Sequence, residues 1–178
     1  LGYIERETGA QNTSLKNYQQ VLQLLLPAWK PATLNEIPPT TLYYSENTFG
    51  DAIAGKAAVL EAMGKKEEAM EHYFACFAAE KKLRAAFFYT ESKYKELEVT
   101  RSRANAAMRL AYAQYKNTGR KKYLDQLLLV SELSKAQILA DERNARLVPT
   151  DNQQLTDTFY RKVRQLQEAV NYYQHELV

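Results

Sequence analysis

The sequence predicts an all-α fold in which antiparallel helix pairs stack into a right-handed superhelical solenoid. Two observations predict this fold. One spacing of small, glycine and aromatic residues occurs twice, and its turn glycines recur at intervals of 55 residues. The 178 residues also contain only 6 glycines and 5 prolines, beside abundant Ala, Leu, Lys, Glu and Gln, which favours helix throughout. No alternating strand pattern with paired turn signals is visible.

The two copies of the spacing share steps of five, four and three residues after the turn glycine, and a small residue seven positions before it. Small residues let two helix backbones approach where they cross, and the aromatic residue fills the space between helices. This pattern resembles the tetratricopeptide repeat, a stacked helix pair. The packing positions are Gly2, Gly9, Ser14, Tyr18 and Val21 in the first copy and Ala57, Gly64, Ala69, Tyr73 and Cys76 in the second.

A degraded third copy is predicted around Gly119. Counting back seven residues places Tyr112 at the tight crossing, and Leu124 takes the position of Ala69. Because both residues are large, we expect this pair to pack more loosely. The interval of 55 residues exceeds the ~34 of this repeat class, so the helices must be longer or carry an insertion.

The chain is predicted to comprise repeats over 1–148 and a C-terminal amphipathic helix over 149–178 that leads to a missing downstream domain. An irregular, proline-containing insert is expected over about 27–47. It either packs its Trp29 and Tyr43 against the helices or reaches a partner. Packing is favoured, because docked aromatic side chains bury large areas. The other segments are expected to be helical: 1–8, 14–26, 48–63, 66–89, a helix that follows a cap at 90–92 and ends at 116, and 121–146.

The C-terminal helix carries apolar residues in steps of four, three, four, three and four, which is a coiled-coil seam. Such a seam needs a partner. The preceding helix is the favoured one, because a short connection favours antiparallel packing; a neighbouring domain or a second copy of the chain is the alternative. The seam residues are Phe159, Val163, Leu166, Val170, Tyr173 and Leu177.

The tract from Leu127 to Leu139, with its Ser-Glu-Leu-Ser-Lys-Ala core, resembles the last repeat of bacterial tetratricopeptide proteins that carry a caspase-like CHAT domain. Further matching tracts are Tyr123-Leu124, Gly55-Lys56-Ala57, Glu91-Ser92-Lys93 and Ile37-Pro38-Pro39. The likeness covers nearly the whole chain and implies a helical arm placed before a protease-like domain. The CHAT domain itself, with its catalytic His and Cys, is not in this chain, so no catalytic residue can be transferred.

Neither catalysis, a cofactor nor a metal is expected. Cys76 falls at a buried packing position, where a structural thiol is favoured over a nucleophile. His72 lies one turn after Glu68, but two ligands are too few for a closed metal site, and an ordinary surface pair is favoured. His175 has no evident partner. No phosphate-binding glycine loop and no Ser-His-Asp arrangement is present.

Net charge is +3, and the cationic runs 65–66, 81–82 and 120–122 are interleaved with Glu. We interpret them as solvated helix surface rather than a nucleic-acid footprint. No apolar run approaches the ~20 residues of a membrane span. The chain opens inside a predicted helix, so we expect a fragment whose targeting signals are missing. A cytoplasmic location is favoured.

The predicted functional surface is the groove lined by the first helix of each pair. Ala58 and Ala113 occupy positions where chaperone-binding repeats place the polar residues of a carboxylate clamp, so the groove suits an apolar or helical ligand instead. We therefore predict a non-catalytic protein-interaction scaffold, with a self-associating module that dimerises through the final helix as the alternative and nucleic-acid binding less favoured. The segment could equally be a plain spacer. The groove residues are Tyr3, Arg6, Asp51, Glu61, Arg109 and Lys116.

Overall fold

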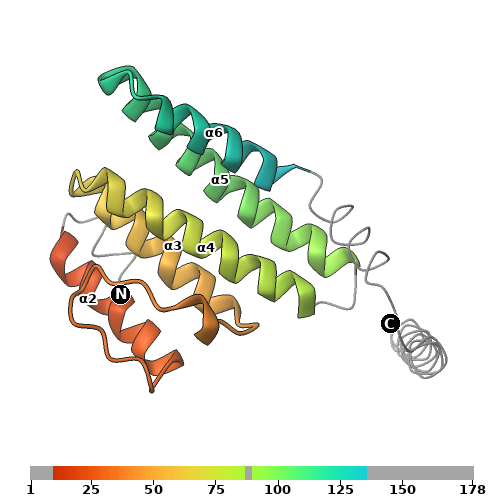
Figure 1. Cartoon of the computed structure of the whole chain (residues 1–178). Coiled ribbons are helices and arrows are strands. Elements are labelled where there is room, and N and C mark those ends of the chain that lie inside the picture. Colours follow the sequence, from red (N-terminus) through yellow and green to blue (C-terminus); the bar gives the residue numbers. More distant parts are fainter. Residues whose placement is uncertain (1–9, 87–89, 136–178) are drawn as a thin grey trace. The chain divides into compact units, whose positions relative to one another are not determined.

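The computed structural model describes residues 10–86 and 90–135 (Figure 1). These residues belong to the first of two compact units, 1–137 and 138–178. In the described part every regular element is a helix and there is no strand, which confirms the all-α prediction. The elements are α2 (Gln11–Leu25), the 3-10 helix η1 (Thr40–Leu42), α3 (Asn47–Ala62), α4 (Lys66–Ala86), α5 (Thr90–Thr118) and α6 (Lys121–Ser134).

Consecutive helices pack against one another along the chain, from α2 on α3 to α5 on α6. Contacts are most extensive within two pairs, α3 with α4 and α5 with α6. Figure 1 shows the α3–α4 pair between α2 and the α5–α6 pair, with the members of each pair side by side. The two pairs together form the frame in which the candidate site lies.

Glycines in the left-handed conformation close α3 and α5. Gly64 has φ +76° and Gly119 has φ +66°, values that residues with a Cβ rarely adopt. At the end of α3 the Gly64 N–H donates to the Glu61 carbonyl at 3.0 Å and the Lys65 N–H donates to the Leu60 carbonyl at 2.9 Å. This pair of bonds is the Schellman arrangement. Both predicted turn glycines that fall in the described residues therefore end a helix.

The small residues expected at the helix crossings lie in the core. Ser14, Ala57 and Ala69 are fully buried. A further close approach was not predicted: the Tyr18 ring lies against Gly55, where an added Cβ would overlap the ring atoms. The α2–α3 contact therefore depends on glycine at position 55.

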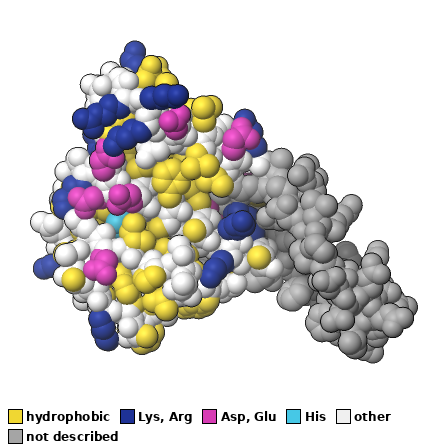
Figure 2. All heavy atoms as spheres, in the orientation of Figure 1, with side chains coloured by type: hydrophobic (Ala, Val, Ile, Leu, Met, Phe, Trp, Pro, Cys, Tyr) yellow, Lys and Arg dark blue, Asp and Glu magenta, His cyan; other side chains and the backbone are white. Residues whose placement is uncertain are grey.

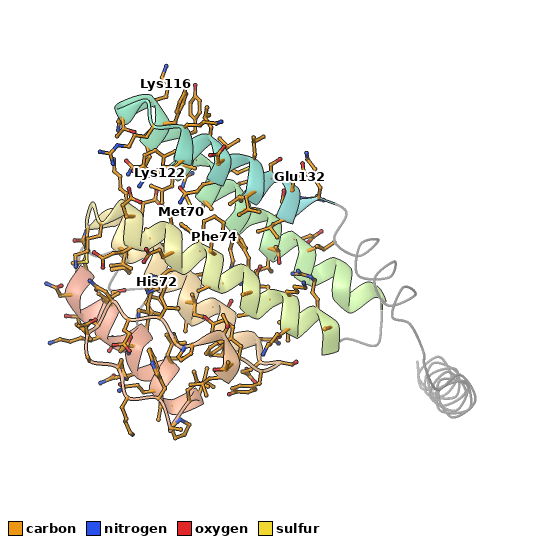
Figure 3. All side chains as sticks on the ribbon, viewed as in Figure 1. Met70, His72, Phe74, Lys116, Lys122 and Glu132 are labelled. Carbon is orange, nitrogen blue, oxygen red and sulfur yellow. The ribbon has the colours of Figure 1, made fainter. Side chains whose placement is uncertain are left out.

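The core consists of two apolar clusters, and Tyr18 packs against both. One is formed by α3, α4, α5 and α6 together with Leu15 of α2, and includes Leu60, Met70 and Val130. Figure 3 shows Met70 and Phe74 on the side of α4 toward α6. The second cluster lies beneath the connection between α2 and α3.

That connection, the predicted insert, packs on the helices. Trp29 and Tyr43 are buried, and the Tyr43 ring meets Phe49 edge-on with centroids 4.9 Å apart. The Lys82 ammonium on α4 donates to the Tyr43 carbonyl at 2.9 Å and the Thr40 carbonyl at 3.2 Å. The favoured interpretation, docking of the aromatic side chains, is what the described residues show.

The predicted register of the third pair is wrong. Tyr112 is 51% exposed, whereas Ala104, Ala107 and Ala111 are buried at the contact. Alanine lets the backbones approach closely, much as glycine does. The loose packing expected for this pair is therefore wrong, because α5 and α6 are among the most extensively packed helices. Leu124 is only half-buried.

Several helix ends differ from the prediction. The helix expected over 121–146 ends at Ser134, because Lys135 is extended (φ −93°, ψ 139°). The Ser134 hydroxyl donates to the Ser131 carbonyl at 2.8 Å, a local bond that competes with the helix. α2 begins at Gln11 rather than at 14, and α5 begins at Thr90 rather than after a cap. Some predictions lie outside the described residues. They are the helices expected over 1–8 and 149–178, the seam, Gly2, Tyr3, Arg6, Gly9 and His175.

Candidate functional site

A groove of about 860 Å³ lies between α3 and α5, with one tyrosine from α2 and one from α4 in its wall. This volume is within the range of ligand-binding pockets. The lining residues that come from α3 are spaced by three and four positions, so they lie on one face of that helix. Most of the side chains on this face are small. The lining is Tyr18, Asp51, Ala54, Gly55, Ala58, Glu61, Ala62, Tyr73, Ser102, Arg103, Ala106 and Arg109.

The groove brings together three of the predicted groove residues, Asp51, Glu61 and Arg109, and two of the predicted packing residues, Tyr18 and Tyr73. Lys116 is exposed and is not part of the lining, although it lies two turns beyond Arg109 on the same helix. Ala58 lines the groove as expected, whereas Ala113 does not. Arg103 was not predicted to line the groove. It lies two steps of three residues before Arg109 on α5, with Ala106 between them, and this helical spacing could have identified it.

At one end of the groove the charges are paired with one another. Arg103 donates to Glu80 Oε1 at 2.5 Å and also pairs with Asp51. Glu80 is only 1% exposed, and its second oxygen has no hydrogen-bond partner in the described residues. The guanidinium therefore holds two carboxylates, one at the groove and one in the core behind it.

Cys76 lies beside this ion pair and is fully buried. Its thiol donates to the Gly50 carbonyl, with sulfur and oxygen 3.4 Å apart. Burial, reinforced by the Glu80 carboxylate, raises the pKa of the Cys76 thiol well above its usual range. The group stays protonated and inaccessible, which fits the structural thiol expected from the sequence.

At the other end of the groove the charges are open to solvent. The Tyr73 hydroxyl donates to Glu61 Oε2 at 3.3 Å. Burial and the Glu61 carboxylate raise the pKa of Tyr73, so this hydroxyl remains a donor at neutral pH. Arg109 is exposed and forms no ion pair with any described residue. A ligand would therefore meet a free guanidinium at this end.

A second polar cluster lies in the core, next to Gly55. The Lys56 ammonium is fully buried and donates to Gln19 Oε1 at 2.5 Å and to the Glu36 carbonyl at 2.8 Å. It thereby joins α3 to α2 and to the insert. Burial lowers the pKa of Lys56 to about 8.

His72 was expected at the surface and is instead 1% exposed. Figure 3 shows it on the side of α4 toward α2. Its Nδ1 donates to the Glu68 carbonyl at 2.8 Å, so the expected side-chain pair is a bond to the backbone. Burial, with a smaller contribution from the nearby Lys56 ammonium, lowers the pKa of His72 to about 4. The ring is neutral at pH 7 and serves packing.

In the ranges 10–86 and 90–135 no three His, Cys, Asp or Glu side chains come close enough to hold a metal ion. Nor does any described helix combine the length and apolar character needed to cross a bilayer. No family model matches this chain, and neither the curated proteins nor the solved structures include one with significant similarity to it.

Proposed function

We propose that this chain is a non-catalytic interaction scaffold of the tetratricopeptide type, whose groove between α3 and α5 holds a peptide or helix of a partner protein. The observation that carries the proposal is the groove itself: about 860 Å³ of space over a face of α3 made of Ala54, Gly55, Ala58 and Ala62. Side chains this small leave room for those of a second polypeptide, and two tyrosines supply aromatic contact area.

The chemical groups around the groove support binding rather than catalysis. Asp51 is occupied by Arg103, Glu61 accepts from Tyr73, and the Cys76 thiol is buried with a raised pKa. A general base or a nucleophile would need to face the groove with a matched pKa and a free reaction partner. These residues instead orient and neutralise one another.

The likeness to the repeats of CHAT-domain proteins adds a biological setting to this proposal. In such an arrangement the scaffold would hold a sensor, activator or substrate near a caspase-like domain that follows it in the chain. The helices would continue as a right-handed solenoid, with the groove on the surface lined by the first helix of each pair.

Selection from a displayed library of random peptides tests the groove directly. Replacing Ala58 with tryptophan fills the groove, while Ala28→Trp adds the same side chain at an exposed position outside it. Peptides selected on the wild-type chain should lose binding to the Ala58→Trp variant and keep it on Ala28→Trp, with circular dichroism checking that both variants fold. If no selected peptide distinguishes the two variants, the groove is not the binding site.

A further inference from the structure

Two cationic runs that are 55 residues apart in the sequence meet at one end of the helix pairs. Lys65 and Lys66 follow Gly64, and residues 120–122 follow Gly119. The Lys122 ammonium donates to Glu67 Oε1 at 2.8 Å, and the Tyr123 hydroxyl bonds the same oxygen. These bonds hold the two turns together, contrary to the scattered arrangement inferred from the sequence.

Most of this positive charge has no counter-ion. Glu67 pairs with Lys122, and Glu68 lies 3.9 Å from Lys65. No described residue forms an ion pair with the remaining cations. Figure 2 shows the dark blue side chains gathered over the end of the molecule where α6 begins. The cations at this end without an ion pair in the described part of the chain, which we call the turn-end cations, are Lys66, Arg120 and Lys121 of the two runs and Lys116 near the end of α5. Of these, Arg120 also acts electrostatically on Glu67.

The groove leads toward this end of the molecule. Arg109 lies in the groove, and Lys116 lies seven residues further along α5, about 10 Å along the helix axis and on the same face. Figure 3 shows Lys116 and Lys122 at the same end of the α5–α6 pair and Glu132 at the other. The positive potential therefore rises from the neutralised Asp51–Arg103 pair toward the turn-end cations.

We propose that the occupant of the groove is an acidic polypeptide segment, with carboxylates that contact Arg109 and Lys116 and small apolar side chains that lie on Ala58. This inference rests on the proposed function and names the chemistry of its ligand. Complementary charge would steer the segment to the groove and fix its direction, with its acidic end over the turn-end cations.

A protein ligand fits these charges better than a nucleic acid does. Glu61 borders the groove, and Glu67 and Glu68 lie among the turn-end cations. A continuous phosphate backbone would meet these carboxylates, whereas a peptide can place neutral or basic side chains opposite them.

The composition of the peptides selected from the random library tests this inference. Asp and Glu should be enriched among peptides that lose binding on Ala58→Trp. The double substitution Arg109→Glu/Lys116→Glu should weaken their binding by about tenfold or more, since it turns two attractions into repulsions. The matched control, Lys16→Glu/Lys30→Glu, changes the net charge equally at exposed positions outside the groove and should leave binding unchanged.

Each other outcome has a distinct meaning. Selected peptides that need the groove but carry no acidic excess, or that tolerate the double substitution, overturn the inference and leave the proposed function intact. Absence of any groove-dependent peptide defeats both. A labelled single-stranded or duplex oligonucleotide that binds the wild type, loses binding on Arg109→Glu/Lys116→Glu and outcompetes the peptides would replace the acidic segment with a nucleic acid.

Discussion

Replacing Lys56 with methionine should change how the stability of the protein depends on pH. The Lys56 pKa is about 8 in the folded chain, below the 10.5 of an ordinary lysine. Between these values the unfolded chain binds more protons than the folded one, so the free energy of unfolding rises with pH. Below pH 8 both states are protonated, and the full penalty of burying the ammonium is present.

The size of the effect follows from the pKa difference. One pKa unit corresponds to about 1.4 kcal/mol, so the folded wild type should gain about 1.4 kcal/mol per pH unit above pH 8, and about 3 kcal/mol in all. Tyr43 and Cys76 act in the opposite direction, since their raised pKa values reduce stability in alkali. Both groups are present in the two proteins, so subtracting the methionine variant from the wild type removes their contribution.

Urea titrations of both proteins at intervals from pH 7 to pH 10 measure this difference. The expected difference in the free energy of unfolding is flat up to pH 8 and then rises in favour of the wild type. Lys16→Met, at an exposed position on α2, controls for the loss of one positive charge. A difference that stays constant across the whole range would refute the lowered pKa, whatever its absolute size.

Two further substitutions test the close contacts beside the groove. Gly55→Ala should destabilise the protein by about 1–3 kcal/mol, because the added Cβ overlaps the Tyr18 ring. In a Tyr18→Ala background the same change should instead stabilise the protein by up to about 1 kcal/mol through helix propensity. A loss of stability in both backgrounds would contradict the overlap. Arg103→Met should cost about 3–5 kcal/mol by leaving the buried Glu80 carboxylate unpaired. Adding Glu80→Gln should recover most of that loss in urea unfolding, and no recovery would show that packing, not charge, is responsible.

Burial of Ser14 in the first repeat copy and of Ala57 and Ala69 in the second could be predicted from the sequence. The register of the third copy could not, and its helix end differs from that at Gly64. At the end of α3 the Gly64 N–H donates to the carbonyl three residues earlier, that of Glu61, which tightens the last turn. At the end of α5 the Gly119 N–H donates to the carbonyl four residues earlier, that of Tyr115, at 2.8 Å. The buried residue near the end of α5 is Ala111, eight positions before Gly119, and not Tyr112, seven positions before it.

The burial of Lys56 and Glu80 could not be predicted, because a charged helix residue is expected to face solvent unless its partner on another helix is known. Lys56 and Glu80 are buried only because partners from other helices reach them, namely Gln19 and Arg103. The meeting of the cationic runs had a signal that was available: each run directly follows a turn glycine, and turn glycines at equal intervals bring equivalent positions to the same end of a stack.

The pairing of charges inside the molecule decides which charges a partner meets. Arg103 is held by Glu80 and Asp51, so it offers little to a ligand. The same pairing removes Asp51 as a repulsive neighbour for an incoming carboxylate. The buried ion pair thereby leaves Arg109 and the turn-end cations to set the sign of the potential that steers a ligand.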